Sequence, residues 1–134
     1  MALTTGSKTI LVVDDEPEVL KYCGEMLKRG GYTVLPASRG EEALRLYREH
    51  KGQIDLALVD VVMPVMSGIE LIGRLKKLNP QMRMALTSGC LPTELKSLLG
   101  PEGSQLRVMW KPFERKALLS MIRHLLDEPT AADE

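Results

Sequence analysis

Five side chains of this 134-residue chain carry the functional groups that phosphoryl transfer requires. They are three carboxylates, a hydroxyl and an ammonium group: Asp14, Asp15, Asp60, Thr87 and Lys111. Carboxylates held close together repel one another, and a divalent cation relieves that repulsion. Mg²⁺ prefers oxygen ligands and combines one or two carboxylates with phosphate oxygens and water. The ammonium and hydroxyl groups could hold the remaining phosphate oxygens, because such catalysis is mainly positioning and charge stabilisation.

These groups all lie at or just after the end of a short apolar run. The runs are 9–13, 56–60, 83–86 and 107–110. Runs that are apolar without alternation and too short for helices are typical of strands covered on both faces in a parallel sheet. The carboxyl ends of parallel strands share one edge, where open α/β sheets place their ligands. We therefore expect these side chains to meet at that edge.

Each group alone has a more ordinary interpretation. An acidic pair after a strand more often caps a helix than binds a ligand. A threonine at a strand end is often only a strand former, and a lysine there is often a solvated charge. The presence of all these groups at one edge favours a functional site.

Helix signals separate the apolar runs. Pro17 suits the first turn of a helix that Gly30-Gly31 closes. A further strand is predicted at 32–35. The sequence Ser38-Arg-Gly-Glu41 has the pattern of a capping box and predicts a second helix, with Gly52 as its stop. The inward face predicted for the first helix comprises Val19, Tyr22, Cys23, Met26 and Leu27.

The second half of the chain continues this alternation. Ser67-Gly-Ile-Glu70 is another capping box, and it opens a helix that Asn79-Pro80 ends. A short, weak helix is predicted at 91–99, a loop at 100–105, and a last helix through Leu126. Five strands alternating with five helices predict an α/β fold, a doubly wound parallel sheet with helices on both faces. Periodicity does not give the strand order. Inward positions predicted for the helix after Ser67 and for the last helix are Ile69, Ile72, Leu75, Leu118, Leu119, Ile122, Leu125 and Leu126.

Composition excludes several classes of function. Basic and acidic residues number 18 each, without the basic excess or stripe that a nucleic-acid-binding protein usually has. No apolar run is long enough to span a membrane, and no signal peptide precedes the first strand. Cys23 and Cys90 form no CxxC pair, which indicates a reducing compartment. We expect a cytoplasmic domain over residues 8–127, with disordered tails at 1–7 and 128–134.

The motifs together resemble the receiver domain of two-component response regulators. The resemblance runs from about Thr9 to Leu126 and rests on Asp14-Asp15, Asp60 with Met63-Pro64 and Met66-Ser67-Gly68, Thr87, and Lys111-Pro112-Phe113. It implies a flavodoxin-like fold with strand order 2-1-3-4-5. It also implies a signalling domain that accepts a phosphoryl group from a sensor histidine kinase or a phosphotransfer protein and then switches a protein-binding face.

The resemblance assigns a role to each site residue. Asp60 would be the phosphoacceptor. Asp15, Asp60 and the carbonyl of Val62 would bind Mg²⁺ directly, and Asp14 would act through water. Thr87 and Lys111 would hold the phosphoryl oxygens, and the bond between Lys111 and Pro112 would be cis.

Two departures concern the switch and the type of receiver. Val108, three residues before Lys111, stands where many members have an aromatic residue, so a switch by an inward-swinging ring is not available. Thr87-Ser88-Gly89, without an effector domain, resembles receivers attached to hybrid sensor kinases. His50 and His124 have no metal-ligand neighbours and are expected to be solvated.

Three other functions can be weighed against the sequence. A Mg²⁺ phosphatase with an aspartyl nucleophile usually has a second Asp two residues later, where this chain has Val62. A P-loop nucleotidase is excluded because the GxxxxGK[ST] motif is absent. The alternative that stays open is a degenerate receiver that binds proteins independently of phosphate.

Overall fold

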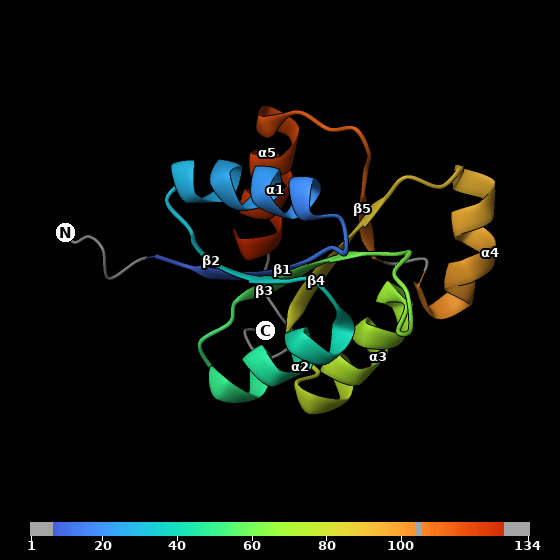
Figure 1. Cartoon of the computed structure of the whole chain (residues 1–134), viewed down its shortest axis with the longest axis horizontal. Helices are drawn as coiled ribbons and strands as arrows, with labels where there is room; N and C mark the ends of the chain where they lie inside the picture. The colour runs from blue at the N-terminus through green and yellow to red at the C-terminus, as the bar shows by residue number, and fades with distance from the viewer. Residues whose placement is uncertain (1–6, 104–105, 128–134) are drawn as a thin grey trace.

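The computed structural model describes residues 7–103 and 106–127, apart from the side chains of 100–103. Within these residues five strands form one parallel sheet in the order β2-β1-β3-β4-β5 (Figure 1). The strands are β1 (Thr9–Val13), β2 (Thr33–Ala37), β3 (Leu56–Asp60), β4 (Arg83–Ser88) and β5 (Arg107–Trp110). The predicted α/β class and the flavodoxin-like strand order are therefore confirmed. The expected tails fall almost wholly outside the described residues.

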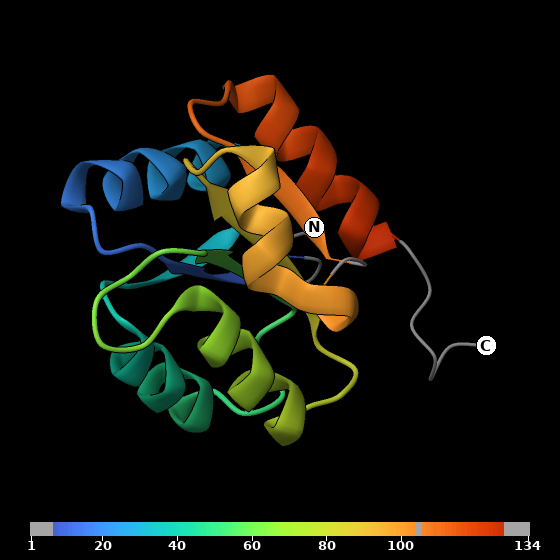
Figure 2. The same ribbon diagram turned by 90° about the vertical axis from the view of Figure 1, so that its right-hand side faces the viewer.

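Helices cover both faces of the sheet. They are α1 (Pro17–Arg29), α2 (Gly40–Glu49), α3 (Gly68–Leu78), α4 (Pro92–Gly103) and α5 (Arg115–Asp127). Helices α1 and α5 lie on one face, and α2 and α3 lie on the other (Figure 1). Helix α4 crosses in front of the sheet between α3 and α5 when the molecule is viewed from the side (Figure 2). None of the helices in the described part of the chain is long and apolar enough to cross a membrane.

Alternate residues of the central strands enter two separate cores. In β1, Ile10 packs into the core beneath α1 and α5, while Leu11 packs into the core beneath α2 and α3. In β3, Leu58 packs into the core beneath α1 and α5, and Val59 packs into the core beneath α2 and α3. Helices cover both faces of the sheet, so the strand side chains that point to either face are apolar. This is why the strand sequences show no alternation of polar and apolar residues.

The close approach of α3 to the end of β3 requires a glycine. A Cβ atom added at Gly68 would overlap the carbonyl oxygen of Asp60 and lie 2.9 Å from the Cα of Val61. The Gly68 N–H donates a hydrogen bond to the Val61 carbonyl at 2.9 Å. Because the neighbouring atoms are backbone, they cannot move aside as a side chain would. Gly68 thus fixes the helix directly behind Asp60.

One predicted helix start, at Ser67, is confirmed, and the one at Ser38 is wrong. The Ser67 hydroxyl accepts a hydrogen bond from the Glu70 N–H at 3.1 Å and begins α3. Helix α2 begins one residue later than the Ser38 pattern implies, with Arg39 at the N-cap. Ser38 instead donates its backbone N–H to Glu42 at 2.7 Å. The backbone N–H of Ser38, just before the helix, is therefore satisfied by the Glu42 carboxylate.

Several element boundaries also differ from the prediction. Helix α4 continues to Gly103 instead of ending at residue 99, although it contains Pro101. Strand β2 runs on to Ala37 through Pro36, which an edge strand tolerates. Strand β4 likewise runs two residues further, to Ser88.

Two side chains were assigned to the wrong environment. Tyr22 was expected in the core, yet it is 50% exposed on the surface of α1. His50 was expected to be solvated, yet it is half-buried at the end of α2, and its Nδ1 lies 3.0 Å from the Leu46 carbonyl oxygen. Neither change affects the edge that carries the carboxylates.

The role of Gly68 gives a test with an internal control. We expect Gly68→Ala to lower the free energy of unfolding by about 1–3 kcal/mol, because the new methyl group has no room. Gly73 lies in the same helix, and a Cβ there would meet nothing within 4 Å. Gly73→Ala should therefore raise stability by about 0.5–1 kcal/mol. Chemical denaturation of both variants checks this, and equal effects would contradict the packing argument.

Candidate functional site

The carboxyl edge of the sheet brings the predicted site residues together. Asp60 is the last residue of β3 and pairs in register with Thr87 of β4. Asp14 and Lys111 directly follow β1 and β5. The Val61 N–H donates to the Thr87 carbonyl at 3.0 Å, and the Lys111 N–H donates to the Ser88 carbonyl at 2.8 Å. Backbone pairing thus continues past the strand ends and fixes the positions of their side chains.

Three carboxylates form a cluster at this edge. Oxygen atoms of Asp14, Asp15 and Asp60 all lie within 4.8 Å of one another. Asp14 and Asp60 are buried, at 2% and 4% exposure, and Asp15 is half-buried. The Glu16 N–H donates to Asp14 Oδ1 at 2.9 Å, which orients that carboxylate. An oxygen-only set of this size fits a hard divalent cation such as Mg²⁺.

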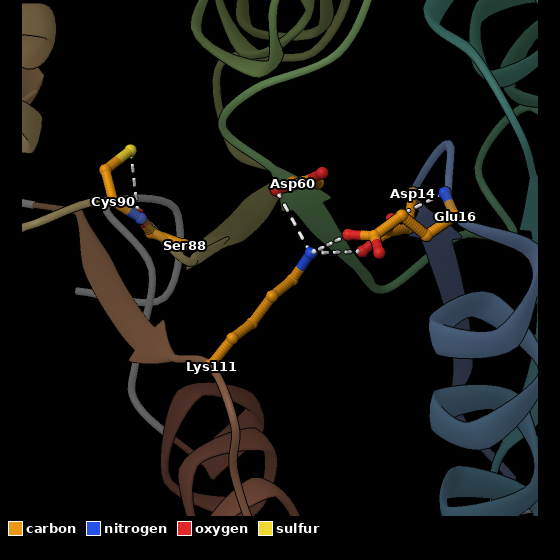
Figure 3. Close-up of polar contacts among 6 residues, drawn as sticks. All are labelled: Asp14, Glu16, Asp60, Ser88, Cys90 and Lys111. Carbon is orange, nitrogen blue, oxygen red and sulfur yellow. Dashed lines mark hydrogen bonds and ion pairs between the residues drawn. The ribbon is translucent and has the colours of Figure 1, made fainter.

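Lys111 supplies the opposite charge. Its Nζ lies 2.9 Å from Asp14 Oδ2 and 3.5 Å from Asp60 Oδ1, as the dashed lines in Figure 3 show. Glu16 makes a third, more exposed contact at 3.4 Å. Burial lowers the pKa of the Lys111 ammonium. The hydrogen bond to Asp14 and the charges of Asp60, Asp14 and Glu16 outweigh burial and leave this pKa above its usual value.

The Asp60 carboxyl group has a raised pKa. Burial, followed by repulsion from Asp14, raises the pKa of Asp60 from 3.8 to about 6. Attraction to Lys111 and a hydrogen bond from the Val62 N–H act in the opposite direction. At neutral pH most molecules therefore carry the carboxylate, the form that can act as a nucleophile or a metal ligand.

The structure also places the other residues of the predicted motif, and it adds one contact that the motif did not predict. The Lys111–Pro112 bond is cis, as the resemblance implies. Thr87 is buried beside Asp60 in the sheet, while the Val62 side chain is 59% exposed. The contact of Glu16 with Lys111 was missed. Its only signal in the sequence is that Glu16 directly follows the acidic pair.

The loop after Asp60 contains a second feature that sequence analysis missed. Val65 has a φ of 69°, and the Met66 N–H donates to the Pro64 carbonyl at 2.7 Å. These two observations define a γ-turn of the rare, strained kind, which a β-branched residue disfavours. The Val65 side chain is 97% exposed. The turn reverses the chain quickly enough for α3 to begin directly behind Asp60.

Neither cysteine takes part in the cluster. Cys23 is buried beneath α1, and burial, followed by the Asp14 charge, raises the pKa of its thiol to about 11. It is therefore protonated and acts as a core residue, as its position on an apolar helix face predicts. Cys90 is half-buried, with its Sγ 3.3 Å from the Ser88 hydroxyl.

A family model and several known sequences match this arrangement. The model of the response regulator receiver domain matches residues 10–123. The sensor kinase CckA of Brucella abortus is 34% identical over 124 residues, which are 92% of this chain and 13% of that protein. The transcriptional regulatory protein CpxR of Klebsiella pneumoniae is 35% identical over 117 residues, which are 87% of this chain and 48% of CpxR. The chain thus spans less than half the length of these relatives.

Solved structures show the same fold. The receiver domain protein from Clostridium thermocellum has a TM-score of 0.80 and 30% identity, covering 90% of this chain and 94% of that one. The receiver domain of the hybrid histidine kinase CckA has a TM-score of 0.74 and 30% identity, covering 89% of this chain and 99% of that one.

The perturbed pKa of Asp60 predicts an unusual dependence of stability on pH. The folded state holds the Asp60 proton more tightly than the unfolded state does, so stability from this group falls as pH rises from about 4 to about 6. Without Mg²⁺, Asp60→Asn should be more stable than the wild type at pH 7 by about 1–2 kcal/mol, since each pKa unit is worth ~1.4 kcal/mol and solvent screens part of the effect.

The measurement is chemical denaturation of both proteins between pH 4 and pH 8. The difference in unfolding free energy should approach zero near pH 4, where Asp60 is protonated. Asp127→Asn, at an exposed position, controls for the loss of one negative charge. A difference that does not change with pH would show that Asp60 is not strained in the folded protein.

Proposed function

The chain belongs to the response regulator receiver domain family of two-component signalling, and on this premise we propose that Asp60 accepts a phosphoryl group from a phosphohistidine. The donor would be a sensor histidine kinase or a phosphotransfer protein. The observation that carries the proposal is the contact of Lys111 with Asp14 and Asp60 inside a cluster of three carboxylates. The same proposal makes the chain a signalling domain and not an enzyme with a separate substrate.

The chemistry is a single displacement. An Asp60 carboxylate oxygen attacks phosphorus, an O–P bond forms, and the P–N bond to the donor imidazole breaks. Negative charge on the transferred group is neutralised by the Lys111 ammonium, which moves from Asp14 to a phosphoryl oxygen. The Thr87 hydroxyl donates to a second oxygen, and the Val62 N–H, which already donates to Asp60, lies close to the reacting group.

Mg²⁺ is the metal that fits the acidic cluster. Asp15, Asp60 and the Val62 carbonyl would bind it directly, and Asp14 would bind it through water. When bound, the ion supplies positive charge that offsets both the carboxylate repulsion and the charge on the phosphoryl oxygens. Lys111 is then free to leave Asp14, because another cation balances that carboxylate.

A groove beside the site suits the docking of the phosphodonor. It has a volume of about 520 Å³ and lies between α1 and the loop that follows β5. Lys111 and Glu16 belong to both the groove and the site, and Val19, Tyr22 and Phe113 give the groove an apolar wall. A helix of a kinase or phosphotransfer protein that packs here would present its phosphohistidine to Asp60. The exposed Tyr22 would then contact the partner.

The output face in this proposal consists of α4, β5 and α5. Within residues 92–99 Leu95 is the only buried residue, and Leu98 is 52% exposed, so few buried apolar contacts hold this part of α4 to the rest of the fold. Val108 and Trp110 line a hollow of about 260 Å³ beneath it. With Val108 in place of an aromatic ring, the change on phosphorylation would be a shift of the helix itself. A cytoplasmic location, where kinase and output partner meet, is part of the proposal.

Phosphorylation by a small donor tests the phosphoacceptor. Incubation with acetyl phosphate and Mg²⁺ should add one phosphoryl group to the wild type, measured by intact mass. Asp60→Asn should gain none, because its amide is not a nucleophile. If Asp60→Asn gains the same mass, the phosphoacceptor is another residue. If neither protein is labelled, the chain is a binding module that works independently of phosphate.

Hydrogen exchange tests the output face. Residues 92–99 of α4 should exchange amide hydrogens faster than α3, which buries Leu71, Ile72 and Leu75. Phosphorylation should increase protection in 92–99 and leave α3 unchanged. Mass spectrometry of peptides before and after acetyl phosphate treatment measures both. An unchanged α4 would place the switch elsewhere in the fold.

The lifetime of the phosphorylated state follows from the residues around it. Hydrolysis needs a water aligned opposite the leaving carboxylate. Val62 offers that water no hydrogen bond. A Cβ at Gly89 would lie 3.9 Å from the Lys111 side chain, so position 89 adjoins the site but has no side chain. We expect slow loss of the phosphoryl group, and about tenfold or more faster loss in Val62→Asn, Gly89→Glu.

The assay follows the decay of purified phosphoprotein in Mg²⁺ buffer. Equal decay rates for wild type and double variant would mean that open access for water at Gly89 matters more than polar positioning.

A further inference from the structure

A basic hollow lies between the end of α1 and the outer surface of α5, away from the carboxylate cluster. It has a volume of about 430 Å³ and is lined by Arg29, Arg115, Lys116, Leu119, Ser120 and Arg123. Four of its six lining residues are cationic and none is acidic. Since the whole chain has equal numbers of basic and acidic residues, this is a local concentration of positive charge that the fold creates.

Packing of α1 against α5 forms the hollow. Both helices cover the same face of the sheet (Figure 1). A Cβ atom at Gly30 would lie 2.7 Å from Leu119 Cδ2, so the missing side chain lets α5 approach the end of α1. Leu119 thereby becomes an apolar floor, with Arg29 on one wall and Arg115, Lys116 and Arg123 on the other. The approach of the helices holds these cations near one another.

The cations of the hollow form no ion pairs within the described part of the protein. None of its four cations has a hydrogen-bond or ion-pair partner among residues 7–103 and 106–127. Arg115 and Lys116 also occupy the first turn of α5, which contains no acidic residue, although the exposed Glu114 directly precedes the helix. The positive end of the helix dipole disfavours cations there. A bound anion would relieve both the mutual repulsion and the conflict with the helix.

We propose that this hollow binds a small molecule that carries two or more phosphoryl groups. Its volume lies in the range typical of small-molecule sites. Three guanidinium groups match the geometry of phosphate oxygens, because each presents a rigid fork of N–H donors. The Ser120 hydroxyl can donate a further hydrogen bond. Tripolyphosphate, which has the charge and the oxygens but no base or sugar, is a suitable probe.

Isothermal titration with tripolyphosphate in EDTA tests the site without contribution from a metal at the acidic cluster. Arg29→Gln, Arg123→Gln should weaken binding about tenfold or more, since hydrogen bonds to charged groups are lost. Arg48→Gln, Lys76→Gln removes the same charge from exposed positions on α2 and α3 and should change affinity less than about twofold. Thermal unfolding of each variant verifies that it is folded.

Three results would overturn the proposal. Equal weakening in both double variants would mean diffuse attraction to the whole protein. Binding of tripolyphosphate no tighter than that of sulfate at equal ionic strength would mean simple screening. Tighter binding of a poly-glutamate peptide than of tripolyphosphate would identify an acidic protein segment as the occupant.

Discussion

Repulsion among three carboxylates at one edge of the sheet is the constraint on which the rest of the structure depends. Asp14, Asp15 and Asp60 have oxygens within 4.8 Å of one another, and two of the three are buried. Burial and repulsion disfavour the charged form of Asp60, as its raised pKa shows. Lys111 offsets part of this cost through its contacts with Asp14 and Asp60. The remaining repulsion is the reason that the proposed metal ion would stabilise this edge.

The fold withstands this repulsion because the strands beneath the cluster are held on both sides. Strand β3 lies between β1 and β4, and all five of its residues are buried between two apolar cores. Gly68 packs α3 directly against the Asp60 backbone, and the turn at Val65 makes that approach geometrically possible. The buried position of Asp60 contrasts with α4, where Leu95 is the only buried residue of 92–99. This contrast is why the proposed switch is assigned to α4.

Sequence-based prediction succeeded best for the buried strands and for the residues that stand at their ends. Asp14, Asp60, Thr87 and Lys111 meet because parallel strands share an edge, which is a property of topology and needs no side-chain detail. Predictions failed where tertiary contacts decide. Tyr22 has helical spacing but lies on the surface, Glu42 replaces Glu41 at the start of α2, and α4 continues past Pro101. Arg29 and Arg123 lie far apart in the chain, so the basic hollow had no signal in the sequence.

The most direct test of the central claim is a crystal structure with Mg²⁺ and beryllium trifluoride, a stable analogue of a phosphoryl group. The account predicts beryllium bonded to an Asp60 carboxylate oxygen and Mg²⁺ about 2.1 Å from oxygens of Asp15 and Asp60. Lys111 should have left Asp14 and should contact a fluorine atom, with the Thr87 hydroxyl on another. The account would be contradicted by the analogue on a different residue, or by Lys111 still paired with Asp14 while the metal binds without Asp60.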